Sequence, residues 1–214
     1  MSGIFLTFEG LDGSGKTTQL QLLVAALRAR GFEVVPTREP GGTFLGQKLR
    51  GVLLDEDLGV APLTELLLFA ADRAQHLEVV VRPAIETGKI VISDRYADAT
   101  VAYQGAGRGF PAEVIRQTVE LATGGLKPDL TLFFDLTTET AFARTNRRAD
   151  QGTELNRLDK EAVDFFERVR RSYLQIAAEE PERFRVIDAN GSIEEIQIEV
   201  LKIINDFLKL RNYD

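Results

Sequence analysis

The stretch GLDGSGKTT, residues 10–18, follows the apolar run IFLTFE and constrains the fold more than any other feature of the sequence. Residues 10–17 match the pattern G-x-x-x-x-G-K-[ST] in full, which predicts a phosphate-binding loop between a strand and a helix. The glycines let the backbone curl and point its amides inward, and the following helix adds the positive end of its dipole. A glycine-rich turn without a ligand is the alternative, and the agreement of pattern and context disfavours it.

Apolar strands and amphipathic helices alternate along the whole chain. Strands are expected at 4–9, 32–37, 89–95, 130–136 and 184–189. Helices are expected from the loop to Gly31, at 43–54, 62–85, 97–103, 111–123, 138–148 and 160–179, and after the S-x-x-E capping box of Ser192 and Glu195. This alternation predicts an α/β fold, a three-layer P-loop architecture with a five-stranded parallel sheet flanked by helices and a short lid segment.

The chain has no internal repeat or linker, so we expect a single domain over 1–214. Parallel sheets bind ligands at the carboxyl ends of their strands. The polar segments 10–17, 38–42, 94–95 and 188–190 all follow expected strands. The sequence therefore predicts that these segments meet in one site.

Composition narrows the functional class. The chain contains no cysteine, which excludes disulfides and thiolate metal sites and favours a reducing compartment. The N-terminus lacks the features of a signal peptide, and no apolar run reaches the roughly 20 residues of a membrane helix. The net charge of -7 disfavours a nucleic-acid polymer as a partner. We expect a cytoplasmic protein that uses neither membrane nor nucleic acid.

The loop residues have distinct expected roles. Lys16 is expected to reach the β and γ phosphates of a nucleotide, and the Thr17 hydroxyl is expected to ligate Mg²⁺. Asp12 would repel phosphates if it faced them. It is expected to point across the loop, toward the hydroxyl of a second ligand or toward metal-bound water. A solvated loop acid is the alternative for Asp12.

A second anion site is indicated at the ends of the next two strands. Arg38 opens the turn REPGG, and arginine recognises phosphate with two parallel hydrogen bonds. Asp94 stands where an acid usually holds water on Mg²⁺, and Arg95 beside it could bind a phosphate. Surface turns and structural ion pairs remain the alternatives.

Two further features lie on helices. Phe69 and Arg73 are four residues apart and share one helix face, so the ring could stack on a base while the guanidinium binds its edge. A core phenylalanine beside a solvated arginine is the alternative. His76, the only histidine, is expected on the helix surface. The polar stretch 144–157 has a net positive charge and contains Arg144, Arg147, Arg148 and Arg157. This pattern suggests a mobile lid over a phosphate site, and a solvated helix end is the alternative.

Together these segments resemble the thymidylate kinase family. The resemblance covers nearly the whole chain through FEGLDGSGKTTQ, REPGGT, LLFAADRAQH, ISDRY, AYQG and the lid-like 144–157, in this order. It is closer to the bacterial form, whose lid carries the catalytic arginines, because the P-loop here contains no arginine.

The resemblance implies a role for each matching residue. ATP would be bound by Gly10, Leu11, Asp12, Gly13, Ser14, Gly15, Lys16, Thr17 and Thr18, with Arg144 against adenine and Asn190 in the adenine loop. Thymine would be bound by Phe69, Arg73, Thr100 and Gln104, and Tyr103 would exclude a ribose 2′-hydroxyl. Arg38 and Arg95 would hold the dTMP phosphate, and Asp12 would contact the sugar 3′-hydroxyl of dTMP or water on Mg²⁺. Metal binding would use Thr17 and, through water, Asp94. The catalytic set would be Lys16, Arg38, Arg95, Arg147, Arg148 and Arg157.

The implied reaction is in-line transfer of a phosphoryl group from ATP to dTMP with Mg²⁺, on the route to dTTP, by a homodimer. A kinase for another nucleoside monophosphate or a deoxynucleoside is the nearest alternative. A P-loop GTPase switch is more remote, because it needs an N/T-K-x-D base reader. The nearest string, Asn156-Arg-Leu-Asp159, has arginine in place of lysine and lies at the lid.

Overall fold

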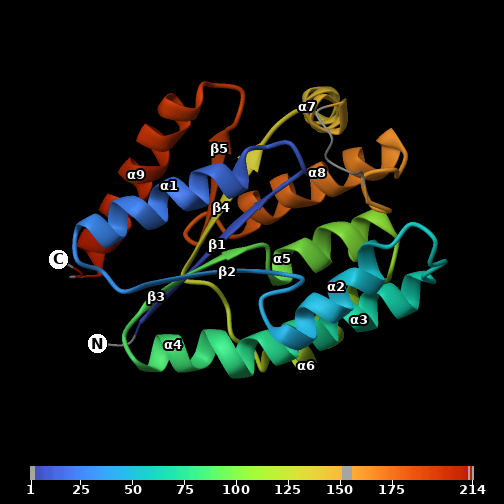
Figure 1. The fold of residues 1–214 in the computed structure, drawn as a ribbon, viewed down its shortest axis with the longest axis horizontal. Helices are drawn as coiled ribbons and strands as arrows, with labels where there is room; N and C mark the ends of the chain where they lie inside the picture. Colours follow the sequence, from blue (N-terminus) through green and yellow to red (C-terminus); the bar gives the residue numbers. More distant parts are fainter. Residues whose placement is uncertain (1–2, 151–155, 212, 214) are drawn as a thin grey trace.

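The computed structural model describes residues 3–150, 156–211 and 213, and only the backbone of Arg148. Within these residues the strands form one five-stranded sheet in the order β2-β3-β1-β4-β5, with every neighbouring pair parallel. The strands are β1 Ile4–Gly10, β2 Val34–Arg38, β3 Ile90–Asp94, β4 Leu130–Asp135 and β5 Phe184–Asp188. Helices flank the sheet on both faces (Figure 1), so the predicted three-layer α/β fold is confirmed.

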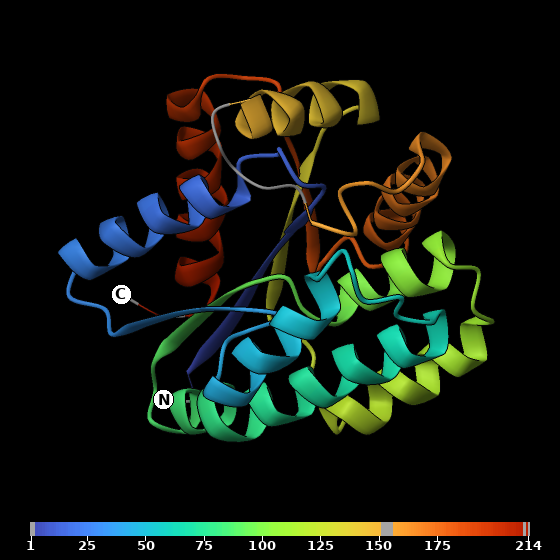
Figure 2. The same cartoon turned by 45° about the vertical axis from the view of Figure 1, so that its right-hand side comes forward.

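The helices divide between the two faces. On one face α1 (Lys16–Ala29) and α9 (Ile193–Leu210) pack against each other. On the other face lie α3 (Pro62–His76), α4 (Arg82–Glu86), α5 (Ala97–Thr100) and α8 (Val163–Glu179). The remaining helices are α2 (Phe44–Leu54) and α6 (Ala112–Thr123), which both contact α3, and α7 (Thr138–Asp150). Figure 2 shows α7 beside the loop between β1 and α1.

Residues of β1 alternate between two core clusters. Ile4, Leu6 and Phe8 belong to one cluster, and Phe5 packs with residues of the α3–α4 region such as Leu77. Alternate residues of a strand point to opposite faces, so a strand covered on both faces must be apolar throughout. This is why IFLTFE is a nearly continuous apolar run.

Two helices begin at the residues that the sequence predicts, because side chains next to the helix start favour it. The capping box of α9 is confirmed: Ser192 Oγ accepts from Glu195 N at 3.2 Å, and Glu195 Oε2 accepts from Ser192 N at 2.8 Å. Pro62 stands at the first position of α3, where its missing N–H costs nothing.

The prediction of one regular helix over 62–85 is wrong in one respect, because the helical hydrogen-bond pattern changes part-way along it. A π-helical segment, η1 (Leu77–Val81), separates α3 from α4. The Arg82 N–H donates to the Leu77 carbonyl five residues back, directly before Pro83. Proline lacks an N–H and its ring clashes with the preceding turn, so the regular α-helical hydrogen bonds are interrupted immediately before it.

A second π-helical segment, η2 (Val101–Gly107), follows α5 and extends the helix expected at 97–103. It carries Tyr103 and Gln104. Near the expected lid, α7 continues to Asp150, beyond the expected end at 148. The lid residues 151–155 lie outside the described residues. Among the residues described, no helix combines the length and apolar character that crossing a membrane would take.

Candidate active site

A cavity of about 300 Å³ opens at the carboxyl ends of β1, β2 and β3. Predicted site residues from distant parts of the chain line it together: Asp12, Lys16, Thr17, Arg38, Phe69, Arg73, Asp94, Arg95, Thr100, Tyr103 and Gln104. Arg144, Arg147, Arg157 and Asn190 do not line it. The meeting of P-loop, second anion site and Phe69–Arg73 face in one cavity follows the topology of parallel sheets.

The loop over 10–15 has the backbone that a phosphate cradle needs. Gly10, Gly13 and Gly15 all have positive φ, and a Cβ on Gly10 would lie 2.7 Å from the Phe134 carbonyl oxygen. Helix α1 begins after Gly15 with no side-chain cap and no acid in its first turn. The amides at this helix start are therefore open to an anion. The buried Ser14 hydroxyl likewise has no hydrogen-bond partner in the described part of the chain.

Lys16 lies beneath this loop with its side chain 5% exposed. Its Nζ donates to the Leu11 carbonyl at 3.2 Å and lies 3.9 Å from Asp12 Oδ1. Burial lowers the pKa of Lys16, and the charge of Arg95 lowers it further, against the opposing charges of Asp94, Asp12 and Glu9. A negative ligand would offset this burial, which is the condition expected of a phosphate-binding lysine.

Three arginines gather at the phosphate end of the cavity. Arg38 is exposed, Arg95 donates through Nη2 to Asp12 Oδ1 at 3.1 Å, and Arg95 Nη1 is buried without a hydrogen-bond partner among the described residues. The third is Arg50 of α2, to which no sequence motif pointed directly. Burial and then the charge of Arg38 lower the pKa of Arg50. Cations packed this closely favour an anion between them.

The base end of the cavity is organised around Arg73. Its Nε donates to Glu39 Oε2 at 2.8 Å, Nη1 to Thr100 Oγ1 at 2.8 Å and Nη2 to the Tyr96 carbonyl at 2.9 Å. A guanidinium has five N–H groups, so these three bonds leave two for a ligand. Phe69, one turn earlier on α3, lines the same cavity.

The expectation that His76 is a surface residue is wrong. His76 is fully buried, with Nδ1 2.8 Å from Glu39 Oε1 and Nε2 2.7 Å from Thr37 Oγ1. Glu39 thus joins His76 to Arg73 and fixes the guanidinium from behind. Sequence patterns assigned no role to Glu39, because its partners lie 34 and 37 residues away along the chain.

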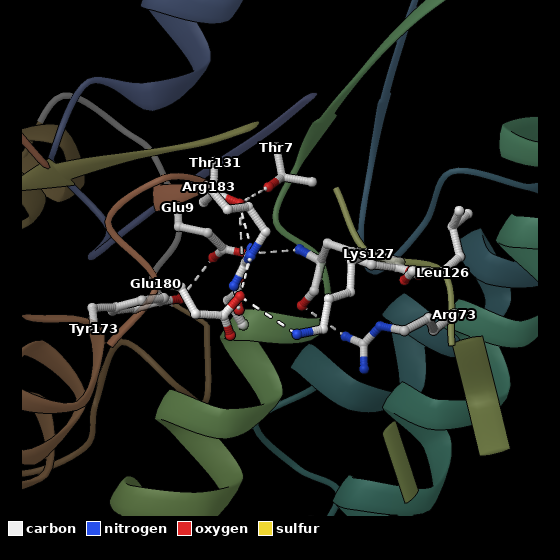
Figure 3. Close-up of polar contacts among 11 residues, drawn as sticks. Thr7, Glu9, Arg73, Leu126, Lys127, Thr131, Tyr173, Glu180 and Arg183 are labelled. Carbon is white, nitrogen blue, oxygen red and sulfur yellow. Dashed lines mark hydrogen bonds and ion pairs between the residues drawn. The ribbon is translucent and has the colours of Figure 1, made fainter. Parts of the chain in front are cut away.

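Behind the phosphate-binding loop, Glu9 is fully buried. Its Oε1 accepts from the Tyr96 N–H at 2.8 Å. Its Oε2 bonds the Tyr173 hydroxyl at 2.7 Å (Figure 3). Burial and the charge of Asp98 raise the pKa of Glu9 to about 8. The bond to the Tyr96 N–H fixes the backbone at this point. The preceding residue, Arg95, has a left-handed φ of 74°. Such backbone strain persists where the surroundings fix it, typically at functional sites.

The expected lid residues are dispersed. Arg144 donates to the Ala189 carbonyl at 3.0 Å, and Asn190 donates to Asp188 Oδ1 at 2.6 Å. Arg147 is exposed. Arg157 does not reach the cavity, because its Nη2 bonds Glu65 Oε2 at 2.6 Å and the Leu53 carbonyl at 3.1 Å.

Comparison with known proteins decides the family. A family model described as thymidylate kinase matches residues 8–200. The chain belongs to the thymidylate kinase family. It is 48% identical over 212 residues to the thymidylate kinase of Desulfovibrio desulfuricans, covering 97% of this chain and 98% of that one. It is 51% identical over 200 residues to the thymidylate kinase of Clavibacter sepedonicus, covering 94% and 93% of the two chains.

A solved structure agrees with these relatives. The crystal structure of thymidylate kinase from Ehrlichia chaffeensis matches with a TM-score of 0.77 and 36% identity, covering 96% of this chain and 99% of that one. As a member of the thymidylate kinase family, the chain is an enzyme that phosphorylates dTMP.

In this thymidylate kinase family member the cavity has further lining residues, among them Glu39, Arg50, Tyr96, Thr145, Leu158 and Asp159. Three of these had a usable sequence signal, since Glu39 and Tyr96 belong to the REPGGT and ISDRY motifs and Arg50 lies on the helix that begins shortly after the REPGG turn.

Proposed function

We propose that the cavity binds dTMP and ATP together and transfers the γ-phosphoryl group of ATP to a phosphate oxygen of dTMP. The carrying observation is that one cavity is lined at one end by Lys16 and Thr17 of the P-loop and at the other by Phe69 and Arg73. Such a cavity can hold a donor triphosphate and a base-bearing acceptor in line.

The donor side would use the loop amides and Lys16 for the β and γ phosphates, with Leu11, Ser14 and Thr18 completing the cradle. Arg144 and Asn190 would lie at the adenine. Their position supports this, since Arg144 bonds the Ala189 carbonyl in the turn after β5 and also approaches the Gly13 carbonyl at 3.5 Å.

Mg²⁺ would be held by Thr17 directly and by Asp94 through water. The residues fit this ion, because Thr17 Oγ1 and Asp94 Oδ2 are hydrogen-bonded at 2.8 Å and both supply oxygen. Mg²⁺ usually binds one or two protein oxygens together with substrate phosphates. When bound, the ion would neutralise charge on the transferred group.

The dTMP phosphate would lie among Arg38, Arg50 and Arg95. Arg95 is steered by Asp12, which lies at the sugar 3′-hydroxyl or at metal-bound water. The acceptor phosphate is ionised at neutral pH, so the reaction needs no general base. Catalysis then consists of positioning and charge neutralisation by Lys16 and the arginines.

The base site would use Phe69 for stacking and Arg73 for the O4 atom of thymine. Thr100 and Gln104 line the same end, and Tyr103 occupies the space of a 2′-hydroxyl, which favours deoxyribose. The free donors of Arg73 support this assignment, because O4 only accepts.

Arg147, Arg148 and Arg157 are the candidates for the lid arginine that acts on the transferred phosphoryl group. Lid closure would also exclude water and so prevent hydrolysis of ATP. Arg147 is exposed, whereas Arg157 would have to leave Glu65.

A homodimer is proposed on the outer face of α2, α3 and α6. Large apolar side chains are exposed on these neighbouring helices: Phe44, Leu45, Leu63, Leu67, Val114 and Leu121. Exposed apolar groups on adjacent helices typically mark a protein interface. Sedimentation of the native chain and of the Leu67→Glu variant tests this. The native chain should sediment as a dimer and the variant as a monomer, and a dimeric variant would contradict the proposed interface. A single domain and a cytoplasmic location remain predictions from the sequence.

The deciding experiment is phosphorylation of a panel of nucleoside monophosphates with ATP and Mg²⁺, followed through ADP release. dTMP is expected to be the preferred acceptor. A preference for another nucleotide, or for a deoxynucleoside, would assign the chain to the neighbouring kinase activity. Titration of ATP against GTP addresses the GTPase alternative.

A further inference from the structure

We propose that Glu65 is a positioning residue that sets base specificity, by turning the Gln104 amide so that its oxygen faces the cavity and accepts a ring N–H. The proposal rests on the base site described above and adds the residue that fixes which end of the Gln104 amide faces the base. Glu65 does not line the cavity itself and acts only through Gln104.

The carboxylate of Glu65 is the centre of a buried polar cluster. Its side chain is 0% exposed on α3. Oε1 accepts from Gln104 Nε2 at 2.9 Å and from Arg108 Nε at 3.1 Å. Oε2 accepts from Arg108 Nη2 at 2.9 Å and from Arg157 Nη2 at 2.6 Å. Two carboxylate oxygens offer about four acceptor positions, so four N–H groups saturate them.

The protonation state of Glu65 follows from these contacts. Burial alone would raise the pKa of Glu65, but hydrogen bonds from Arg108, Gln104 and Arg157 outweigh burial and lower it below its usual value. An ionised carboxylate only accepts hydrogen bonds. The nitrogen end of Gln104 must therefore face Glu65, and its oxygen end must face away.

The oxygen of Gln104 has no competing partner. Across 3–150, 156–211 and 213, no group donates a hydrogen bond to Gln104 Oε1, while Gln104 itself lines the cavity. Arg73 lines the same end and is anchored by Thr100, one helical turn before Gln104. The base end therefore combines an acceptor from Gln104 with donors from Arg73.

This arrangement matches an imide base. Thymine and uracil present a carbonyl acceptor at position 4 and an N–H donor at position 3. Cytosine presents an amino donor at position 4 and an unprotonated acceptor nitrogen at position 3. The amino donor of cytosine would therefore face the donors of Arg73, and its acceptor nitrogen would face the acceptor oxygen of Gln104. Mismatched buried polar groups reduce kcat/KM steeply, by roughly 5- to 150-fold for each mismatch.

The test replaces Glu65→Gln and compares kcat/KM for dTMP, dUMP and dCMP. Arg108 and Arg157 require an acceptor, so the oxygen of the new amide would face them and its NH₂ group would face Gln104. Gln104 would then turn its own NH₂ group toward the cavity. The dTMP to dCMP ratio should fall by at least roughly 10-fold. The dTMP to dUMP ratio should not change, because both bases carry the same groups at positions 3 and 4.

The matched control is Glu161→Gln, which removes the 2.6 Å ion pair of Glu161 with Arg108 but does not contact Gln104. It should leave both ratios unchanged. General damage to the fold would lower kcat/KM for all three nucleotides together and leave the ratios intact.

A folded Glu65→Gln variant that keeps the native dTMP to dCMP ratio would overturn the proposal. If that variant does not fold, Gln104→Leu decides instead, since loss of the acceptor should also lower the ratio and an unchanged ratio refutes the role. The unmodified chain provides the separate check on the base site. If it shows no preference for dTMP, the proposed function fails before any variant is compared.

Discussion

The hydroxyl of Thr17 donates a 2.8 Å hydrogen bond to Asp94 Oδ2 and so joins the first turn of α1 to the end of β3. The two residues are 77 positions apart along the chain. Their contact brings a hydroxyl and a carboxylate to the edge of the phosphate-binding loop, where a metal-bound nucleotide would lie.

Asp94→Asn should weaken the response to Mg²⁺. An amide keeps the shape of the side chain but loses the charge that orders metal-bound water, and loss of such an outer ligand costs roughly 10- to 100-fold in metal affinity. The half-saturating Mg²⁺ concentration for activity should rise by this factor. Binding of dTMP without metal serves as the control and should not change. An identical Mg²⁺ titration would remove Asp94 from the metal site.

Lys16→Met should reduce kcat by at least roughly 100-fold without loss of stability. In the proposed mechanism the lysine supplies the fixed charge on the transferred group. Because burial lowers the pKa of Lys16, folding disfavours its charged form, so an apolar chain of similar length should leave Tm equal or higher. ADP release and thermal denaturation measure the two effects. Normal turnover in the stable variant would contradict the assignment.

Arg73→Lys should lower kcat/KM for dTMP by roughly 5- to 150-fold while the KM for ATP stays constant. Lysine keeps a charge for Glu39 but cannot bond Thr100, Tyr96 and a base edge at once. Arg73→Ala is the harsher comparison. It leaves the buried Glu39 carboxylate without its ion-pair partner, which costs about 3–5 kcal/mol of stability. Unchanged use of dTMP by Arg73→Lys would refute base recognition by this residue.

The free energy of unfolding should fall as pH rises through the range set by Glu9. The folded pKa of about 8 lies above the ordinary glutamate pKa of 4.5, so the folded state binds the proton more tightly. The stabilisation is complete below the unfolded pKa and is lost between about pH 4.5 and pH 8, with a slope of at most about 1.4 kcal/mol per pH unit.

Glu9→Gln is the matched variant for this pH dependence. Its amide can accept from the Tyr96 N–H and donate to the Tyr173 hydroxyl, as a protonated glutamate does. Chemical denaturation at several pH values should show a flatter profile for Glu9→Gln than for the native chain. Parallel profiles would show that folding does not raise the pKa of Glu9 above its value in the unfolded chain.

The paired replacement Arg147→Ala with Arg148→Ala should lower kcat by at least roughly 100-fold, with little change in the Kd of dTMP or in Tm. Arg157→Ala should instead lower Tm, because it removes a partner of the buried Glu65. A strong loss of kcat in Arg157→Ala without loss of stability would mean that Arg157 leaves Glu65 during turnover.

Part of the site was predictable because its signals are local. The glycines, Lys16 and Thr17 of the loop stand in a fixed spacing, and the strand and helix around them are coded by adjacent residues. The capping box of α9 and the apolar strands are similarly short-range. The carboxyl-end rule for parallel sheets then placed Arg38 and Asp94 near the loop without any knowledge of contacts.

The rest depends on contacts between distant segments. Periodicity alone put His76 on a helix surface, yet it is buried because Glu39 and Thr37 satisfy both ring nitrogens. Arg157 stands in a polar, basic stretch that is typical of a lid. The carboxylate of Glu65, 92 residues away along the chain, holds it outside the cavity.

By itself the sequence determined the order of strands and helices along the chain, the phosphate-binding loop and the family to which the chain belongs. Each depends on neighbouring residues or on fixed spacings. Only the tertiary structure decided which polar side chains become partners, including the direction of the Gln104 amide and the anchoring of Arg73. A buried polar group must find its hydrogen-bond partner in space, and the fold brings that partner from any part of the chain.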